Sequence, residues 1–323
     1  MNEVKRIILF HAGALGDLIC TEPSVRAIRE KWPFAEIHAV GNMPGLVLLK
    51  EAGTIDHALS LDAPGMHLLF RSEALSQVMK DSLGGYDLAV TWIRAQSITD
   101  HLSCLGVRVA ALRDRFPPSS GSGHIVDFMA KPLKELGIEK VPEYPRLSVT
   151  EAVLEKSPSF SGILVHPGSG SEKKNWTTAG FRDAAREIAK KSGLPLGIIK
   201  GPADEKAAGQ LMNELGNEAE FFEDLSTLRL AGLLSRARLL LGNDSGVSHL
   251  AGALGTPVVS VFGPTDPEVW GVRQPWARNV AAGTECSPCT RELMWKCSDR
   301  ECLSSLSPDK VADQALQLLG GSG

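Results

Sequence analysis

The sequence has no long hydrophobic run and no marked excess of one charge. None of its apolar stretches approaches the roughly 20 residues that cross a bilayer, and its first residues suggest an apolar strand entering a loop rather than a signal peptide. The 34 Lys and Arg residues against 38 Asp and Glu give a net charge of −4, without the basic field that holds proteins on nucleic acid. We therefore expect a cytoplasmic protein that binds no nucleic acid and contacts a membrane surface only peripherally.

Cysteine is scarce and unevenly placed. Two of the six cysteines stand alone, and four crowd near the C-terminal end: Cys286, Cys289, Cys297 and Cys302. These are too few and too local for a disulfide-stapled scaffold. The spacing of Cys286 and Cys289 suits half of a zinc site, which the last two could complete, but it permits a metal without demanding one. A structural loop with reduced or paired cysteines is the interpretation that we favour.

Short runs of β-branched residues and leucine alternate with amphipathic stretches along the chain, which is typical of βαβ units in a parallel sheet. In the first half the pattern predicts strands at 6–10, 36–40, 86–92 and 107–112, and helices at 22–31, 43–52 and 124–136. In the second half it predicts strands at 163–166, 196–200, 238–241 and 258–262, and helices at 178–191, 204–215, 228–236, 247–254 and 308–319.

Proline, serine and charged residues interrupt this alternation between residues 143 and 161, which predicts a linker with one short helix. A chain of 323 residues is long enough for two domains of about 150 residues each. We therefore predict two doubly wound α/β domains, residues 1–150 and 151–323, that face each other across a cleft. Ligands of such sheets bind beyond the carboxyl ends of the strands, so the loops there are the candidate sites.

In each predicted domain, one glycine-containing loop follows the first strand. In HAGALGDLICTEP, residues 11–23, two glycines permit a tight turn and Asp17 is placed to cap the next helix. The GxGxxG pattern of a dinucleotide site is absent. In HPGSGSEKKNW, residues 166–176, glycines, the hydroxyls of Ser169 and Ser171, and two lysines make a composition that suits an anion. A solvated surface turn is the alternative interpretation.

The third loop begins the segment GNDSGVSHLAGALGTPVVSVFGP, residues 242–264. It leads from a strand into a helix whose first amides, at Ser245 and Gly246, would stabilise a diphosphate together with the positive end of the helix dipole. His249 follows one turn later and could reach the same oxygens, although a lone histidine in a helix is more often a packing residue.

Together these motifs resemble the ADP-heptose glycosyltransferases of lipopolysaccharide core assembly, glycosyltransferase family 9. The resemblance spans nearly the whole chain and rests on HAGALGDLICTEP, HPGSG followed by KKNW, GPADE, NDSGVSHLAGALGTP, VFGPTDP and the cysteine-containing tail. It implies a GT-B glycosyltransferase architecture of two Rossmann-like domains, with the acceptor on the N-terminal domain and the nucleotide-sugar donor on the C-terminal domain.

The implied reaction is inverting transfer of heptose from ADP-heptose to a lipopolysaccharide core or a lipid-linked or other cell-envelope glycan, at the cytoplasmic face of the inner membrane. No cofactor is implied, and the absence of an Asp-x-Asp motif agrees with transfer that needs no metal. Asp17 resembles the general base that takes the proton of the acceptor hydroxyl. Lys174 resembles the lysine that neutralises the departing diphosphate.

The resemblance also assigns the donor contacts. Glu205 would contact the ribose, and Leu225 would lie against the adenine. The remaining donor-binding residues would hold the phosphates and the sugar: Ser169, Gly170, Lys174, Asp244, Ser245, Gly246 and His249.

The acceptor site is expected among arginines of the first domain, because core acceptors carry phosphates and acidic sugars. The candidates are Arg94, Arg108, Arg113 and Arg115, of which we select Arg94 and Arg113. Each of them could equally be an ordinary surface arginine. Three other functions stay open: transfer from a different nucleotide sugar, non-catalytic nucleotide-sugar binding, and nicotinamide-dependent dehydrogenation, against which the missing GxGxxG argues.

Overall fold

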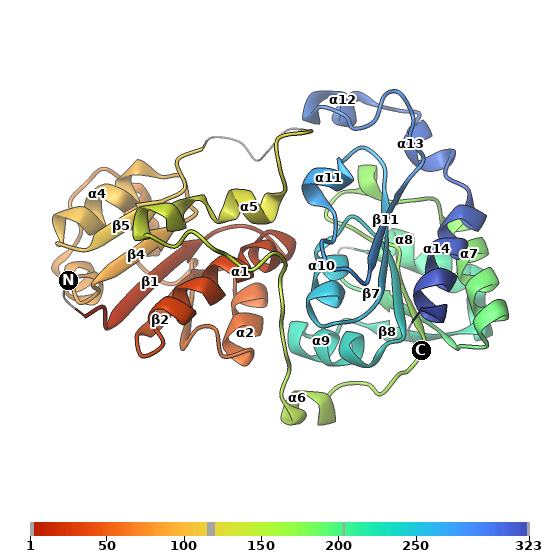
Figure 1. The fold of residues 1–323 in the computed structure, drawn as a ribbon, viewed down its shortest axis with the longest axis horizontal. Helices are drawn as coiled ribbons and strands as arrows, with labels where there is room; N and C mark the ends of the chain where they lie inside the picture. Colours follow the sequence, from red (N-terminus) through yellow and green to blue (C-terminus); the bar gives the residue numbers. More distant parts are fainter. Residues whose placement is uncertain (1–2, 115–119, 203, 322–323) are drawn as a thin grey trace. The chain divides into compact units, whose positions relative to one another are not determined.

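The chain forms two compact units, each built on a parallel sheet with helices on its faces (Figure 1). The structure is a computed structural model that describes residues 3–114, 120–202 and 204–321. The described residues divide into a first unit, 3–114 with 125–148, and a second unit, 120–124 with 149–321. The change at 148–149 falls in the segment where the sequence predicts a linker, whereas no sequence pattern indicated that 120–124 belongs with the second unit.

The first unit contains a five-stranded sheet in the order β3-β2-β1-β4-β5. Its strands are β1 (Arg6–His11), β2 (Glu36–Gly41), β3 (His57–Ser60), β4 (Leu88–Thr91) and β5 (Arg108–Ala111). Its helices are α1 (Leu15–Lys31), α2 (Met43–Glu51), η1 (Met66–Phe70), α3 (Gln77–Leu83), α4 (Gln96–Cys104), α5 (Ile125–Met129) and η2 (Lys131–Leu136). One face of the sheet, with Ile8 and Phe10 of β1, packs in a common core with residues of η1, α3 and α4.

Two helices of this unit differ from the sequence prediction because of proline. The helix expected at 22–31 begins at Leu15, where the Asp17 carboxylate accepts a hydrogen bond of 3.1 Å from the Ala14 amide. Pro23 lies inside this helix, so the expected end of the loop at Pro23 is wrong; the proline removes one amide donor, and the buried side chains around it hold the helix together. The helix expected at 124–136 divides into α5 and the 3-10 helix η2, which contains Pro132.

The second unit contains a six-stranded sheet in the order β11-β10-β9-β6-β7-β8. Its strands are β6 (Ile163–His166), β7 (Leu196–Lys200), β8 (Ala219–Glu223), β9 (Leu239–Asn243), β10 (Val258–Phe262) and β11 (Ala277–Ala281). Its α-helices are α6 (Glu151–Glu155), α7 (Thr178–Ser192), α8 (Glu205–Leu215), α9 (Thr227–Arg236), α10 (Gly246–Ala253), α11 (Pro267–Trp270), α12 (Arg291–Lys296), α13 (Glu301–Ser304) and α14 (Pro308–Gly320). Its 3-10 helices are η3 (Glu172–Lys174) and η4 (Gly216–Glu218).

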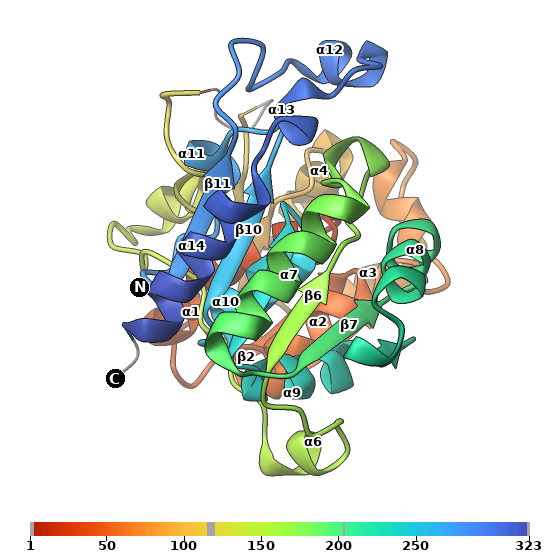
Figure 2. The same ribbon diagram turned by 90° about the vertical axis from the view of Figure 1, so that its right-hand side faces the viewer.

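The helices of the second unit cover both faces of its sheet. Helices α7 and α14 lie side by side over one face (Figure 2), where Phe181 and Val311 join the core made by alternate strand residues. Within the parts of the chain that the structure describes, no helix combines the length and apolarity that a membrane span requires.

The strand order of the second unit also defines where a ligand would bind. From β6 the chain builds outward through β7 and β8, then returns to place β9 on the other side of β6. The loops that leave the carboxyl ends of β6 and β9 therefore diverge, and this switch point is where doubly wound sheets bind ligands.

Candidate functional site

The β6–α7 loop, residues 167–177, is fixed to the end of β9 by one buried amide side chain. Asn243 is fully buried; its Nδ2 donates to the carbonyls of Pro167 and Gly168 at 2.8 and 3.3 Å, and its Oδ1 accepts from the Trp176 amide at 2.9 Å. Such an amide saturates three backbone groups that neither strand could pair. The two loops of the switch point are therefore held in one arrangement.

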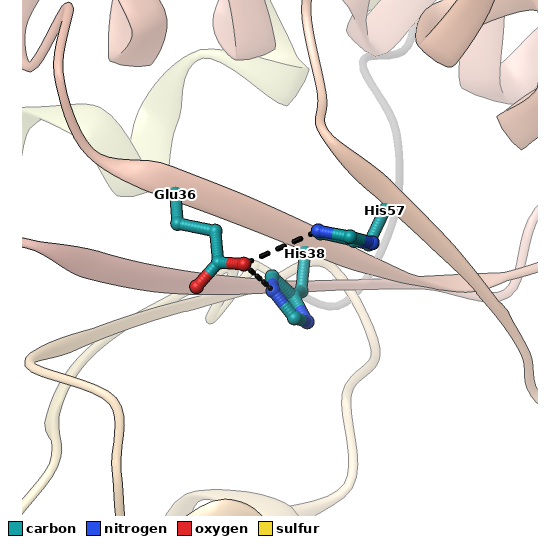
Figure 3. Close-up of side chains that lie close together, drawn as sticks. All are labelled: Glu36, His38 and His57. Carbon is teal, nitrogen blue, oxygen red and sulfur yellow. Dashed lines mark ion pairs between the residues drawn. The ribbon is translucent and has the colours of Figure 1, made fainter.

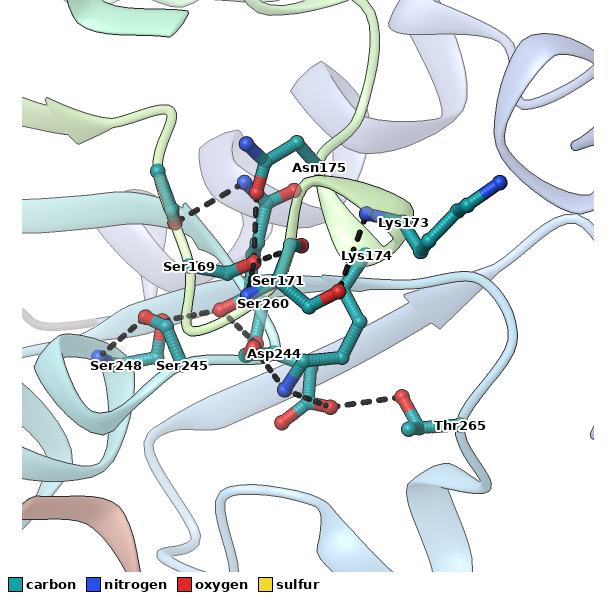
Figure 4. A network of polar contacts seen from close by, with 12 residues as sticks. Ser169, Ser171, Lys173, Lys174, Asn175, Asp244, Ser245, Ser248, Ser260 and Thr265 are labelled. Carbon is teal, nitrogen blue, oxygen red and sulfur yellow. Dashed lines mark hydrogen bonds and ion pairs between the residues drawn. The ribbon is translucent and has the colours of Figure 1, made fainter. Parts of the chain in front are cut away.

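Lys174 and Asp244, both predicted from the sequence, meet at this place (Figure 4). Lys174 Nζ lies 3.0 Å from Asp244 Oδ2 and donates to the Asp244 carbonyl at 3.0 Å. The Thr265 hydroxyl, from the loop after β10, donates to the same Oδ2 at 2.7 Å. The Lys174 side chain is 21% exposed and the Asp244 side chain 8% exposed. A nearly buried carboxylate therefore holds the ammonium group in position.

From the sequence we expected the Ser169 hydroxyl to bind a phosphate, but in the structure this hydroxyl makes hydrogen bonds within its own loop. Its oxygen lies 2.7 Å from the Ser171 carbonyl and 2.6 Å from Asn175 Oδ1 (Figure 4). Gly170 is exposed, and a Cβ added to it would meet no atom within 4 Å. Of the two lysines, Lys173 donates to the Cys297 carbonyl at 2.7 Å, which leaves Lys174 as the lysine of the switch point.

Helix α10 begins directly beside this pair. Ser245 is its N-cap, with Oγ accepting from the Ser248 amide at 3.4 Å. The Ser248 and Ser260 hydroxyls both donate to the Asn243 carbonyl, at 2.6 and 3.0 Å. Because the first amides of a helix lack intrahelical partners, the start of α10 at Gly246 attracts negative charge, as the sequence predicted.

His249 lies on the first turns of α10 and is buried. Burial lowers its pKa to about 4, against the opposing effect of Asp244, and His124 and Lys174 lower it further. The ring also makes a hydrogen bond with the Trp270 backbone. His124 belongs to the same unit and contacts the Gly271 carbonyl through Nε2 at 2.9 Å. His249 is thus neutral near pH 7.

A second buried pair supports the start of the β6–α7 loop from the end of β7. His166 Nε2 lies 2.9 Å from Asp204 Oδ2, which also accepts from the Gly201 amide at 3.1 Å. Burial would raise the pKa of Asp204, but the hydrogen bond and charge of His166, with the Gly201 amide, hold it below its usual range. A Cβ on Gly168 would stand 1.7 Å from Asp204 Oδ1, so only glycine fits there.

The two residues predicted to contact the nucleoside lie at the ends of the neighbouring strands. Glu205 begins α8 after β7, and its side chain is 79% exposed with Oε2 3.2 Å from Lys200 Nζ. Lys200 also pairs with Glu223 at the end of β8, at 2.6 Å. Leu225 follows Asp224, whose φ of 48° turns the chain at the end of β8. All predicted donor residues therefore gather at the carboxyl edge of one sheet.

Asp17 lies in the first unit, where a corresponding loop leaves the carboxyl end of β1. Its Oδ2 accepts a hydrogen bond from the Ala14 amide, so the prediction that Asp17 caps the helix is confirmed. Its role as a base stays a prediction. His11 Nδ1 accepts from the Gly13 amide at 3.2 Å, and the Thr21 hydroxyl, which donates to the Asp17 carbonyl, lies 3.1 Å from His11 Nε2. These contacts indicate a neutral ring with its proton on Nε2, in accord with burial that lowers the pKa of His11 to about 4.

The selected arginines share one shallow cavity of the first unit. Arg94 and Arg113 both line a space of about 230 Å³ past the ends of β4 and β5. Arg113 Nε also lies 3.2 Å from Glu135 Oε1. Arg108 begins β5, at the opposite end of that strand, and binds the Glu135 carbonyl at 2.8 Å. Arg115 lies outside the described residues.

The cysteines of the tail have free thiols. Burial, with the neighbouring tail cysteines, raises the pKa of Cys302 to about 11 and also raises that of Cys289. The four sulfurs do not lie close enough to form a group of ligand atoms within 4.8 Å; within the described ranges, only Glu36, His38 and His57 form such a group.

Comparisons with known proteins place the chain in a family. The model of glycosyltransferase family 9 (heptosyltransferase) matches residues 111–298. Lipopolysaccharide heptosyltransferase 1 of Pseudomonas aeruginosa is 27% identical over 185 residues, a match that spans 52% of this chain and 51% of that protein.

Two solved structures share the fold over nearly the full length. The glycosyl transferase family 9 protein of Veillonella parvula has a TM-score of 0.80 and 20% identity, covering 100% of this chain and 99% of its own. The ADP-heptose lipopolysaccharide heptosyltransferase II of Escherichia coli has a TM-score of 0.74 and 16% identity, covering 98% and 99%.

The two parallel α/β sheets and this likeness define the fold as that of the GT-B glycosyltransferases. Within that class, the chain belongs to glycosyltransferase family 9, the heptosyltransferase family, and is a glycosyltransferase.

Proposed function

We propose that the protein transfers a heptose from ADP-heptose to a lipopolysaccharide core or a related cell-envelope glycan, with inversion and without a metal ion at the diphosphate. The observation that carries the proposal is the convergence of Lys174 and the N-terminus of α10 at the switch point of the second sheet. The similarity to a lipopolysaccharide heptosyltransferase 1 and to an ADP-heptose lipopolysaccharide heptosyltransferase II supports the choice of donor and acceptor class.

The donor site would act on the leaving group. As the acceptor oxygen bonds to the anomeric carbon, the bond from that carbon to the diphosphate oxygen breaks and negative charge grows on the diphosphate. The α10 amides and the Lys174 ammonium group attract this charge more strongly than they attract the intact donor, so they lower the barrier rather than merely binding substrate.

His249 would join this interaction by gaining a proton. Its neutral ring has one N–H, which the Trp270 backbone engages. The second ring nitrogen can therefore donate to a phosphate only when the ring is protonated, and a bound diphosphate favours that protonation.

Asp17 would be the base. It would take the proton of the attacking hydroxyl while one of its oxygens stays on the Ala14 amide. A carboxylate of ordinary basicity suffices, because the hydroxyl becomes acidic only as the new bond forms; such bases contribute about 10²–10⁴-fold. In the same proposal Glu205 contacts the ribose, Leu225 lies against the adenine, and Arg94 and Arg113 bind acidic groups of the acceptor.

The donor assignment is tested by calorimetric titration of the purified protein with ADP, ADP-heptose, UDP, GDP and NAD. Selective binding of the two adenine diphosphates, weakened in Lys174→Ala but not in Lys173→Ala, is the expected result. Lys173 is the matched control, because it bonds to the Cys297 carbonyl rather than to the Asp244 pair. Preference for UDP or GDP would overturn the heptose donor, and binding of NAD alone would overturn glycosyl transfer from this site.

The base is tested with Asp17→Asn. The amide oxygen of asparagine can still accept from Ala14, so the helix start is preserved while the basic group is lost. We expect ADP-heptose affinity within a few-fold of the unsubstituted protein and a transfer rate about 10²–10⁴-fold lower. An Asp17→Asn protein that transfers heptose at the original rate would exclude Asp17 as the base.

A further inference from the structure

Three side chains with the atoms of a metal site gather on β2 and β3 of the first sheet (Figure 3). Glu36 Oε1 lies 3.2 Å from His38 Nε2 and 3.2 Å from His57 Nε2. All three ligand atoms lie within 4.8 Å of one another. None of these residues belongs to the donor, acceptor or base assignments made above.

The sheet itself brings the three together. Glu36 and His38 are two residues apart on β2 and so project to the same face. His57 opposes His38 in the parallel register of β2 and β3, which places its side chain on that face as well. Glu36 and His57 begin their strands, whereas the Asp17 loop follows the carboxyl end of β1, so the cluster is a separate site of the first unit.

The spacing is that of ligands around one small ion. Nitrogen and oxygen ligands about 2.0–2.1 Å from a tetrahedral Zn²⁺ stand roughly 3.3 Å apart. The two distances of 3.2 Å at Oε1 match this value. His38 Nε2 is buried, and its partner is the Glu36 carboxylate at 3.2 Å, which also faces His57 Nε2. A metal ion between these three atoms would replace the contacts of the carboxylate with the two rings by bonds to all three ligands.

The outer atoms of the ligands are held by neighbours. The Tyr86 hydroxyl lies 2.9 Å from His38 Nδ1, and Arg6 Nε lies 3.2 Å from Glu36 Oε2. The Arg6 guanidinium also stacks over the Tyr86 ring, 4.6 Å from its centre. In metal sites the second atom of each histidine or carboxylate ligand is usually engaged in this way, which leaves the first atom aimed at the ion.

We propose that Glu36, His38 and His57 bind one Zn²⁺ ion, which fastens the edge strand β3 to β2. Two imidazoles and one carboxylate favour such an ion over Mg²⁺ or Ca²⁺, which prefer oxygen ligands only. His57 is 50% exposed, so water can occupy the fourth position. The role is structural, because the site lies at the strand ends away from the Asp17 loop.

The test uses the full chain without a histidine tag. Bound zinc is measured by elemental analysis after equilibrium dialysis, and Co²⁺ is titrated as a spectroscopic probe. His57→Ala removes one ligand, and Tyr86→Phe removes only its hydroxyl support. His67→Ala is the matched control, since His67 is an exposed histidine of the same unit outside the cluster.

We expect one zinc per chain that is lost in His57→Ala and kept in His67→Ala. Tyr86→Phe should weaken the affinity about 10–100-fold, as loss of an outer hydrogen bond does. Saturating Zn²⁺ should raise the melting temperature of the unsubstituted protein by roughly 5–10 °C and leave that of His57→Ala unchanged.

Cobalt separates this site from the tail cysteines, because thiolate ligands give intense charge-transfer bands in the near ultraviolet and imidazole or carboxylate ligands do not. Visible bands without thiolate bands, absent in His57→Ala, support the proposal. The absence of bound metal, thiolate bands alone, or equal loss of metal in His57→Ala and His67→Ala would each overturn it. His57 is half exposed, so its removal leaves the fold intact, and Tyr86→Phe gives an independent reading.

Discussion

Removal of Lys174 should weaken diphosphate binding in two separable ways. In the protein without ligand its ammonium group lies 3.0 Å from Asp244 Oδ2. The Asp244 side chain is only 8% exposed, and the Thr265 hydroxyl is the other donor to that oxygen among the contacts of the described chain. Lys174→Ala therefore deletes a cation for the ligand and also leaves a nearly buried carboxylate beside the proposed diphosphate site.

The size of each effect follows from this geometry. A hydrogen bond to a charged group contributes about 1.5–3 kcal/mol. Two like charges about 6 Å apart repel by about 3 kcal/mol at an effective dielectric constant of about 20. Together they predict ADP binding about 10³–10⁴-fold weaker in Lys174→Ala. In the double variant Lys174→Ala with Asp244→Asn the repulsion is gone, and the loss should be only about 10–100-fold.

Calorimetric titration with ADP measures both values, and ADP is the suitable probe because it has the diphosphate without the heptose that Asp244 could contact. Lys173→Ala should bind ADP as the unsubstituted protein does. Equal affinity of the single and double variants would refute the repulsion by Asp244. Unchanged affinity of Lys174→Ala would refute the placement of the diphosphate beside this pair.

Three further predictions concern the glycines and histidines of the two units. Gly168→Ala places a Cβ 1.7 Å from Asp204 Oδ1 and should abolish ADP binding or destabilise the second unit by about 3 kcal/mol. The control is Gly209→Ala, whose Cβ meets no atom within 4 Å and which should do neither in titration and urea unfolding. The pKa of His11 is lowered from 6.5 to about 4 in the folded protein, so the unfolded state gains a proton first as the pH drops. The free energy of unfolding therefore falls as the pH drops from 6.5 to about 4. In urea unfolding at several pH values, His11→Gln should reduce the dependence of this free energy on pH by about 1.4 kcal/mol per pH unit. If His249, whose pKa is about 4 without ligand, gains a proton beside the diphosphate, ADP affinity should fall less from pH 7.5 to pH 5.5 in the unsubstituted protein than in His249→Asn, where only the phosphate of ADP titrates.

The central strands could be predicted from the sequence, whereas three of the four edge strands could not. β1, β2, β5, β6, β7 and β10 lie within one residue of the predicted ranges, and of these only β5 is an edge strand. The strands without a prediction are β3, β8 and β11, which form sheet edges and have mixed burial. An edge strand has fewer neighbours to cover it, so its sequence lacks the continuous apolar run by which a central strand is recognised.

The candidate site divides in a similar way. Loop composition predicted an anion site at the two lysines of the β6–α7 loop and at the start of α10, because glycine, hydroxyl and lysine side chains near strand ends suit an anion directly. The family resemblance then selected Lys174 and Asp244. The supports of the site had no such signal: Asn243 and Asp204 bind backbone and side-chain groups 38 to 76 residues away, and only the fold brings these partners together. The cluster of Glu36, His38 and His57 could not be predicted from the sequence either, because His57 lies on β3, a strand that the sequence did not predict.

The proposed donor site would therefore separate affinity from selectivity. The proposed diphosphate contacts lie between β6 and β9, on loops that the buried Asn243 holds together. The proposed nucleoside contacts, Glu205 and Leu225, lie beyond the ends of β7 and β8 on exposed or half-exposed chain. Every nucleoside diphosphate would meet the first set, so Lys174 should change the affinity for all of them alike. Preference for adenine can arise only from the second set, where substitution is tolerated because no buried network depends on it.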